Sequence, residues 1–221
     1  MIEAVIFDCD GVLVDSEVLA LEVELAALSE IGLDYDPAEF SARFMGMNNL
    51  TFFDALAADC RDRKGHDLPQ GFAQACHARY RAAFTRLGEV PGAGAAISSI
   101  AHRKAVASSS EVDVLEEKLR RTGLWELFAP HVYSTDLVPS AKPAPDIFLH
   151  AARALNAEPA ECLALEDSSN GVRAACAAGM RVWGFLGGGH MDAASGARLL
   201  AAGAERLVAD WVEAAVLLAT D

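Results

Sequence analysis

The sequence is poor in basic residues. Its 221 residues include 18 lysines and arginines against 32 aspartates and glutamates, which gives a formal net charge of −14. Non-specific binding to nucleic acid or to an anionic membrane needs clustered positive charge, so neither kind of partner is expected. If the substrate is itself an anion, a metal ion or a few well-placed cationic side chains must supply the positive charge.

Long apolar runs and paired cysteines are also missing. No run of about 18 apolar residues occurs, which argues against a membrane-spanning helix, and the first residues lack the basic and apolar regions of a secretory signal. The five cysteines form no C-x-x-C pair and are read as reduced thiols. These absences predict a cytoplasmic protein, and a hydrophobic content of 52% is ample for a sizeable core.

Short apolar runs alternate with helical patterns along most of the chain. The runs, each bounded by turn residues, lie at 2–7, 104–107, 131–133, 162–165, 181–185 and 206–208. This alternation is typical of a parallel sheet with helices on both faces. We therefore expect an α/β fold in which the sheet is the middle one of three layers.

Residues 16–88 follow a different pattern, because helical segments succeed one another there with no strand-like run between them. The pattern predicts a helical region inserted between the first and second strands of the sheet. The expected division is an α/β catalytic core formed by residues 1–15 and 89–221, and a helical cap domain formed by residues 16–88.

Polar side chains collect where four of the apolar runs end. In chain order they are Asp8 and Asp10, then Ser108 to Ser110, then Lys142, and finally Glu166 with Asp167. Taken singly, each has an ordinary reading as a turn residue, a helix cap or a solvated lysine. In an open α/β sheet, however, the ligand crevice lies outside the carboxyl ends of the strands. Complementary groups at four strand ends therefore predict one site.

These groups are the ones that magnesium-assisted phosphoryl transfer needs. Mg²⁺ prefers hard oxygen ligands and needs only one or two carboxylates beside a phosphate oxygen, which Asp8 and Asp167 can supply. Lys142 and a serine hydroxyl can hold the remaining phosphate oxygens. An aspartate can also attack phosphorus and form an aspartyl-phosphate. Asp10, two residues from Asp8 and on the same side, can act first as general acid and then as base.

Four motifs resemble those of the haloacid dehalogenase superfamily. They are FDCDGVLVDSE at 7–17, AVASSS at 105–110, SAKPAPDIF at 140–148 and LALEDSSNGVRAACAAGM at 163–180. All four follow the order and spacing of that family, with the helical region between the first and the second. The resemblance implies a Rossmann-like core with an α-helical cap, Mg²⁺ as the cofactor, and a phosphoric monoester hydrolase that acts on a small phosphorylated metabolite.

The resemblance also implies roles for individual residues. Asp8 is the expected nucleophile and Asp10 the acid and base, while Ser108 and Lys142 hold the phosphate. The expected metal ligands are Asp8, Asp10, Glu166 and Asp167. The expected substrate-binding residues are Gly11, Ser109, Arg43, Gly46, Asn48 and Asn49.

Four of these substrate-binding residues, namely Arg43, Gly46, Asn48 and Asn49, belong to the cap. Arg43 is expected to recognise an anionic group of the substrate, and Asn48 and Asn49 offer neutral donors suited to sugar hydroxyls. The alternatives are equally ordinary, namely a surface arginine on a cap helix and asparagines that serve a loop turn.

Departures from other branches of the family favour a phosphatase. Dehalogenases use no metal and generally lack the second aspartate, whereas this chain has Asp10 and the pair Glu166-Asp167. A phosphonatase needs a cap lysine that forms a Schiff base, and Lys64 reads as a solvated loop residue. The β-phosphoglucomutase branch is the serious alternative. Asn49 stands where its cap arginine would fall, and Ala20 stands near the place of its cap histidine.

The nearest resemblance within the family is to sugar-phosphate phosphatases, including those that act on 6-phosphogluconate. It rests on VDSEV at 14–18, ARFMG at 42–46 and GGGH at 187–190. We expect a Mg²⁺-dependent phosphatase for a sugar phosphate or a phosphorylated sugar acid that works through an aspartyl-phosphate. A phosphosugar mutase and a non-catalytic binding protein of the same fold are the alternatives. The expected assembly is a monomer or a weak homodimer.

Overall fold

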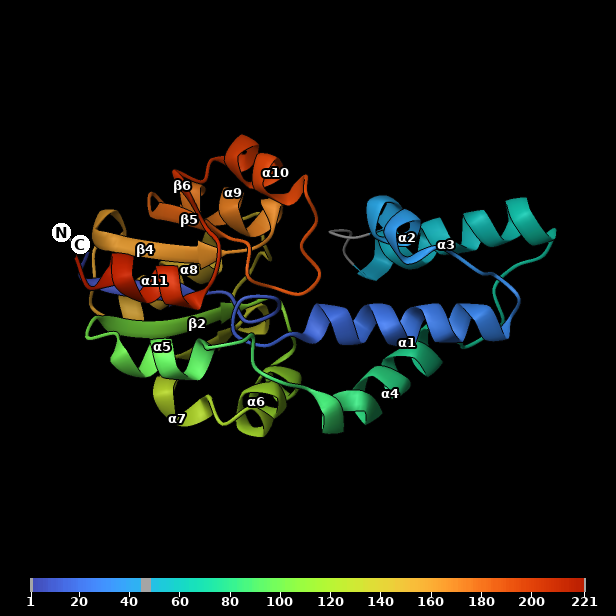
Figure 1. The fold of residues 1–221 in the computed structure, drawn as a ribbon, viewed down its shortest axis with the longest axis horizontal. Coiled ribbons are helices and arrows are strands. Elements are labelled where there is room, and N and C mark those ends of the chain that lie inside the picture. The colour runs from blue at the N-terminus through green and yellow to red at the C-terminus, as the bar shows by residue number, and fades with distance from the viewer. Residues whose placement is uncertain (1, 45–48, 221) are drawn as a thin grey trace. The chain divides into compact units, whose positions relative to one another are not determined.

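The computed structural model of the protein describes residues 2–44 and 49–220. The chain divides into two compact units, of which the first consists of Met1–Glu17 with Leu87–Asp221 and the second of Val18–Arg86 (Figure 1). The first unit is thus assembled from two stretches of chain, and the second unit is an insertion between them.

A six-stranded parallel sheet forms the centre of the first unit in the described part of the chain. Its strands are β1 (Ala4–Phe7), β2 (Arg103–Ser108), β3 (Val132–Ser134), β4 (Cys162–Glu166), β5 (Arg181–Phe185) and β6 (Arg206–Val208). The spatial order is β3-β2-β1-β4-β5-β6, so β1 lies between β2 and β4. Phe7 at the end of β1 is in register with Val106 of β2 and Leu165 of β4. The carboxyl ends of these three strands therefore meet at one edge of the sheet.

Helices connect the strands of the first unit. They are α5 (Ala93–Ser99), α6 (Val112–Arg121), α7 (Trp125–Phe128), α8 (Asp146–Ala154), α9 (Ser169–Ala177), α10 (Ser195–Ala202) and α11 (Trp211–Leu218), with the 3₁₀ helices η2 (Thr135–Leu137) and η3 (Pro159–Glu161). Figure 1 shows α9 and α10 on one side of the strands and α5 and α7 on the other. Strands and helices alternate along the chain, and the predicted α/β fold class with a parallel sheet between two helical layers is confirmed.

Alternate residues of β1 face opposite layers of the core, because successive side chains of a strand point to opposite faces. Ala4 and Ile6 belong to the apolar cluster that includes residues of α8, α9 and α10. Val5 and Phe7 belong to the cluster that includes residues of α5, α6, α7 and α11. All four side chains are buried, which explains why β1 reads as an unbroken apolar run. A strand buried on both faces is a rigid support for the residues that follow it.

The regular secondary structure of the described residues in the second unit is helical. The helices are α1 (Ser16–Glu30), which begins at the end of the first unit, α2 (Pro37–Phe44), α3 (Asn49–Lys64), α4 (Phe72–Ala83) and the 3₁₀ helix η1 (Phe84–Arg86). Their core contains the rings of Phe40, Phe44 and Phe52, whose centroids lie 5.0–6.0 Å apart. Within residues 2–44 and 49–220, no helix combines the length and apolar character that crossing a membrane requires.

Candidate active site

A tight turn follows β1 and fixes the first two acids of the site. The Asp8 amide donates to the Leu165 carbonyl of the neighbouring strand at 3.0 Å, and the Leu13 and Val14 amides donate back to the Cys9 carbonyl. Gly11 occupies the turn with φ of +74°, and a Cβ atom there would lie 1.9 Å from a carboxylate oxygen of Asp167. Only glycine satisfies both the positive φ and the close approach. The turn therefore brings the end of β1 against the end of β4.

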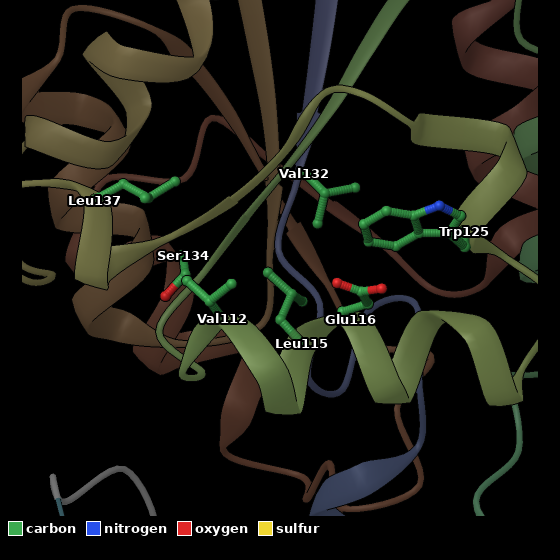
Figure 2. Close-up of a pocket in the computed structure, with 7 residues that line it drawn as sticks. All are labelled: Val112, Leu115, Glu116, Trp125, Val132, Ser134 and Leu137. Carbon is green, nitrogen blue, oxygen red and sulfur yellow. The ribbon is translucent and has the colours of Figure 1, made fainter.

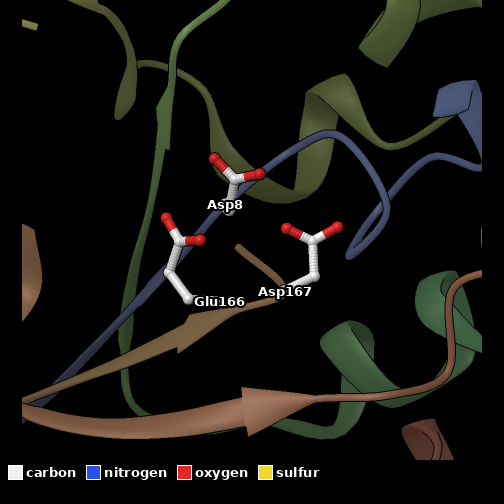
Figure 3. A group of neighbouring side chains, drawn as sticks. All are labelled: Asp8, Glu166 and Asp167. Carbon is white, nitrogen blue, oxygen red and sulfur yellow. The ribbon is translucent and has the colours of Figure 1, made fainter. Parts of the chain in front are cut away.

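Three carboxylates meet at this edge of the sheet. Asp8, Glu166 and Asp167 each offer an oxygen, and these three oxygens lie within 4.8 Å of one another (Figure 3). Glu166 is completely buried, and Gly171 of α9 makes room for it, since a Cβ atom there would lie 1.9 Å from the Glu166 carboxyl carbon. We call these three residues the acid group.

Lys142 places one ammonium ion against the acid group. Its Nζ donates to Asp8 Oδ1 and to Glu166 Oε1, each at 2.6 Å, and to the Ala107 carbonyl at 2.9 Å. Burial by itself would lower the pKa of Lys142, but the charges of Asp8 and Glu166 raise it above its ordinary value. Lys142 is therefore a permanent cation that faces two of the three acids.

One ammonium ion does not compensate three buried carboxylates. Burial raises the pKa of Asp8 to about 7, against the opposing charge of Lys142. Burial also raises the pKa of Glu166 and that of Asp167 above their ordinary values. Surplus negative charge on hard oxygen donors at one point is the environment that Mg²⁺ favours. The donor set therefore fits a magnesium ion.

Asp10 lies beside the acid group, and its carboxylate is directed to other partners. Its Oδ1 accepts hydrogen bonds from the Ser16 hydroxyl and the Lys118 ammonium group, and its Oδ2 accepts one from the Ser110 hydroxyl at 2.8 Å. Burial would raise the pKa of Asp10, but Lys118 and the two hydroxyls lower it below its ordinary value. In the described residues the side chain of Asp10 is not part of the acid group. Its position suits proton transfer better than metal ligation through the carboxylate.

The three serines at the end of β2 and directly after it have different environments. Ser108 is completely buried, and its Oγ accepts a hydrogen bond from the Ser110 amide at 3.0 Å. Ser109 is exposed. The Ser110 hydroxyl donates to Asp10 and accepts from Lys118 at 3.0 Å. Of the three, Ser110 is the one that the structure connects to an expected catalytic acid.

Lys118 was not among the residues expected in the site, because the sequence of α6 reads only as a charged, amphipathic helix. The side chain is only 3% exposed. A signal was present in the sequence, since Leu115, Lys118 and Leu119 follow the spacing of one helical face and all three are buried. A lysine on the apolar face of a helix needs a buried acceptor, and Asp10 is that acceptor.

The segment that contains GGGH also reaches the site. His190 Nε2 lies 3.3 Å from Asp167 Oδ2, and the Gly189 amide donates to Asp15 Oδ1 at 3.1 Å. Burial would lower the pKa of His190, but the hydrogen bond and charge of Asp167 raise it. Glu17 also faces this region, where burial raises its pKa to about 7 and neighbouring aspartates add to the rise. The sequence assigned no role to His190 or Glu17, because their partners are remote in the chain.

The residues expected to bind substrate from the cap can be placed only in part. Arg43 lies in the last turn of α2, and its side chain, 42% exposed, donates to Asp59 Oδ1 at 2.5 Å. Asn49 is the first residue of α3. Gly46 and Asn48 lie outside the described residues.

A small pocket elsewhere in the first unit is not the site. It has a volume of about 50 Å³ and lies between α6, α7 and β3 (Figure 2). Its lining residues are Val112, Leu115, Glu116, Trp125, Val132, Ser134 and Leu137. Pockets that bind small organic molecules have volumes of roughly 300–1,000 Å³, and this one holds no member of the acid group.

The first unit combines a parallel α/β sheet with a group of acids and one lysine at the carboxyl ends of its strands. A model of the haloacid dehalogenase-like hydrolase family matches residues 2–179. The chain belongs to this family, and it is an enzyme of the phosphoric monoester hydrolase class. The predicted family membership is thereby confirmed.

Known proteins similar to this chain include phosphatases. The 6-phosphogluconate phosphatase of Escherichia coli is 31% identical over 194 residues, which cover 86% of this chain and 85% of that protein. The phosphorylated carbohydrates phosphatase of Thermotoga maritima is 33% identical over 211 residues, 93% of this chain and 94% of that protein. The crystal structure of a haloacid dehalogenase family hydrolase from Deinococcus radiodurans, with bound phosphate and sodium, superposes with a TM-score of 0.87. It is 35% identical, and the match covers 99% of this chain and 96% of that one.

Proposed function

We propose that the protein is a Mg²⁺-dependent phosphatase that hydrolyses a sugar phosphate or a phosphorylated sugar acid. One observation carries the proposal, namely the convergence of Asp8, Lys142 and the pair Glu166-Asp167 on one buried point at the end of β1. The similarity to phosphatases named for 6-phosphogluconate and for phosphorylated carbohydrates supports the class of substrate. The proposal also places the reaction in the cytoplasm and makes the second unit a cap that selects the substrate.

The acid group is the proposed metal site. Asp8 and Asp167 would hold the ion, with Glu166 adjacent and oriented by Lys142. When bound, a magnesium ion supplies positive charge that neutralises phosphate oxygens. Asp10 was expected to be a further ligand, but in this proposal its carboxylate transfers protons, because its oxygens are held by Ser16, Ser110 and Lys118.

In the first proposed step, the Asp8 carboxylate attacks phosphorus. A bond forms between an Asp8 oxygen and phosphorus, and the bond between phosphorus and the ester oxygen breaks. Asp10 takes up a proton when the phosphate dianion binds beside it, because the added negative charge raises the pKa of Asp10. It then gives this proton to the departing oxygen, so the sugar leaves as an alcohol. Lys142 and the Ser108 hydroxyl hold the other phosphate oxygens, where their charge and dipole favour the developing negative charge. Ser109 and the Gly11 turn complete this part of the proposed site.

In the second step, water cleaves the aspartyl-phosphate. The water oxygen attacks phosphorus and gives its proton to Asp10, while the bond between phosphorus and Asp8 breaks. Inorganic phosphate leaves, and Asp8 and Asp10 return to their starting states. The same carboxylate thus serves as acid and then as base, and every proton that it gives away it receives back.

Release of phosphate from a panel of sugar phosphates and phosphorylated sugar acids tests the proposal. Wild type, Asp8→Asn and the exposed control Asp62→Asn are compared in Mg²⁺ and in EDTA. Loss of the nucleophile should lower kcat by at least ~10³-fold, EDTA should abolish turnover, and Asp62→Asn should behave as wild type. Phosphate release by Asp8→Asn at the wild-type rate would refute the proposed chemistry. Interconversion of hexose phosphates that depends on a bisphosphate, without phosphate release, would establish the mutase instead.

A further inference from the structure

Three hydrogen-bond donors from three separate elements hold the carboxylate of Asp10. They are the hydroxyl of Ser16 at the start of α1, the hydroxyl of Ser110 after β2, and the ammonium group of Lys118 in α6. An ionised carboxylate offers about four acceptor positions. Among the residues that the structure describes, donors occupy three of these positions, which leaves about one for a proton or for a group that exchanges a proton.

Lys118 links two of these partners. Its Nζ contacts Asp10 Oδ1 and also donates to the Ser110 hydroxyl at 3.0 Å, and that hydroxyl in turn donates to Asp10 Oδ2. The carboxylate is therefore held at both oxygens by one connected set of donors. Rotation of the carboxylate about its Cβ–Cγ bond would break contacts at both ends.

A lysine at this position is costly for the fold. Its side chain is 3% exposed and lies on the face of α6 that carries the buried Leu115 and Leu119. Taking an ammonium ion out of water costs several kcal/mol, which a single ion pair repays only with good geometry, and an apolar side chain of similar volume is often neutral or more stable. Packing alone therefore does not account for Lys118.

We propose that Lys118 is a positioning residue for the proton-transfer aspartate. Lys118 and Ser110 fix the direction of the Asp10 carboxylate, so that its one free acceptor position points at the oxygen that receives or loses the proton. The inference rests on the proposed function and goes beyond it, because it assigns the accuracy of the proton transfer to a residue in α6. Such a transfer requires an Asp10 oxygen to lie about 3 Å from the oxygen that gains or loses the proton.

The positioning role of Lys118 can be tested by comparing activity on substrates with different leaving groups. An alkyl ester of phosphate releases a strongly basic alkoxide oxygen that needs the proton of Asp10 when its bond to phosphorus breaks. p-Nitrophenyl phosphate releases p-nitrophenolate, a stable anion that departs without a proton. A variant in which Asp10 is misaligned should therefore lose activity on the alkyl ester and retain most of it on the aryl ester. A variant with a damaged phosphate site should lose both.

The experiment measures kcat/KM for both esters in saturating Mg²⁺, because kcat/KM reports only the steps up to the formation of the aspartyl-phosphate. Lys118→Met should lower the value for the best sugar phosphate by about 10²-fold and the value for p-nitrophenyl phosphate by less than about fivefold. Lys118→Arg, which keeps a cationic donor, should restore part of the loss. The inhibition constant of inorganic phosphate should not change.

Two further variants keep the test decisive. Lys104→Met is the matched control, because Lys104 is a partly buried lysine away from Asp10. Its ammonium group donates to the carbonyls of Ile97 and Ile100 at the end of α5. Lys104→Met should leave both kcat/KM values unchanged. If circular dichroism shows that Lys118→Met does not fold, Ser110→Ala takes its place, because it removes the donor to Oδ2 and should show the same dependence on the leaving group.

The possible results distinguish the positioning role of Lys118 from the proposed phosphatase function. Equal losses on both esters, or no loss on either, would overturn the positioning role while leaving the phosphatase intact. A wild type that hydrolyses neither ester would overturn the proposed function and this inference with it.

Discussion

Two clusters of charge in this molecule, each built around one or more buried carboxylates, have opposite balances. In the first unit, Lys142 faces the acid group, so carboxylates outnumber cations and the pKa of each carboxyl is raised, chiefly by burial. In the second unit, two arginines face a single carboxylate, that of Asp59, and its pKa is lowered. A cluster with surplus negative charge gains stability from an added cation, whereas a cluster that already holds enough cations does not.

The cluster in the second unit is satisfied by its own side chains. Asp59, with a side chain 9% exposed, accepts hydrogen bonds from Tyr35, from Arg43 at 2.5 Å and from Arg63 at 3.4 Å. Burial would raise the pKa of Asp59, but Arg43 and Tyr35 lower it. Burial and the contact with Asp59 raise the pKa of Tyr35 to about 12. The network connects α2, α3 and the segment between α1 and α2, and it holds Arg43 in one orientation.

The largest effect is expected when the ammonium ion that faces the acid group is removed. Lys142→Met would leave the acid group with no ammonium ion and remove a group that holds phosphate. We expect kcat to fall by at least ~10³-fold and the free energy of unfolding in EDTA to fall by about 3–5 kcal/mol. Urea denaturation with and without Mg²⁺ measures the second effect. Stability equal to that of wild type in EDTA would show that the acids do not need Lys142.

Added magnesium should distinguish the two clusters. Mg²⁺ should raise the free energy of unfolding of the wild type by about 2.7 kcal/mol at 100 times its Kd, because the acid group binds the ion in the folded state. Asp167→Asn should abolish this increase, and Asp59→Asn should leave it unchanged. Thermal denaturation over a series of Mg²⁺ concentrations makes the measurement. The same increase in Asp167→Asn would place the ion elsewhere.

Asp59→Asn should break the second cluster without affecting chemistry. It leaves Arg43 and Arg63 close together with no carboxylate between them, so the free energy of unfolding should fall by about 1–3 kcal/mol. Hydrolysis of p-nitrophenyl phosphate should keep its wild-type kcat. Chemical denaturation measures the free energy of unfolding, and a kinetic assay measures kcat. A large loss of kcat with unchanged stability would contradict the structural role of Asp59.

Acid should weaken this cluster in the wild type. The folded-state pKa of Asp59 lies below its ordinary value of 3.8, so its contribution to stability is complete above that value and is lost as the pH falls through the lowered pKa. Asp59→Asn lacks this titrating group. Its free energy of unfolding should therefore fall less steeply than that of wild type on acidification below pH 3.8. Parallel pH profiles would show that Asp59 is not stabilised by its partners.

Much of the site followed from the positions of residues at strand ends. Asp8 and Glu166 directly follow apolar runs, and parallel strands bring such positions together. The side chains that pair with the acids of the site were harder to predict from the sequence. Lys118 sits in a helix with five other charged residues, and its burial depends on how α6 packs on the sheet. The contact of His190 with Asp167 joins two loops across the end of the sheet, and no local pattern predicts it.

The smallest effect concerns the substrate group that Arg43 is proposed to recognise. Charge-assisted hydrogen bonds contribute roughly 1.5–3 kcal/mol, so Arg43→Gln should lower kcat/KM for a phosphorylated sugar acid by about tenfold or more. The same substitution should lower kcat/KM for a neutral sugar phosphate by about twofold or less, because that substrate has no carboxylate for Arg43 to contact. Arg61→Gln, which removes an exposed arginine paired with Asp67, is the control. Equal losses on both substrates would show that Arg43 does not discriminate between them.

Detection of the covalent intermediate tests the central claim most directly. The wild type is mixed with Mg²⁺ and its best substrate, quenched in acid within one turnover, digested and examined by mass spectrometry. We expect phosphate on Asp8 in the peptide that spans the end of β1, and no such modification in Asp8→Asn. Rapid turnover with no phosphate on Asp8, or with phosphate on another residue, would contradict the central claim.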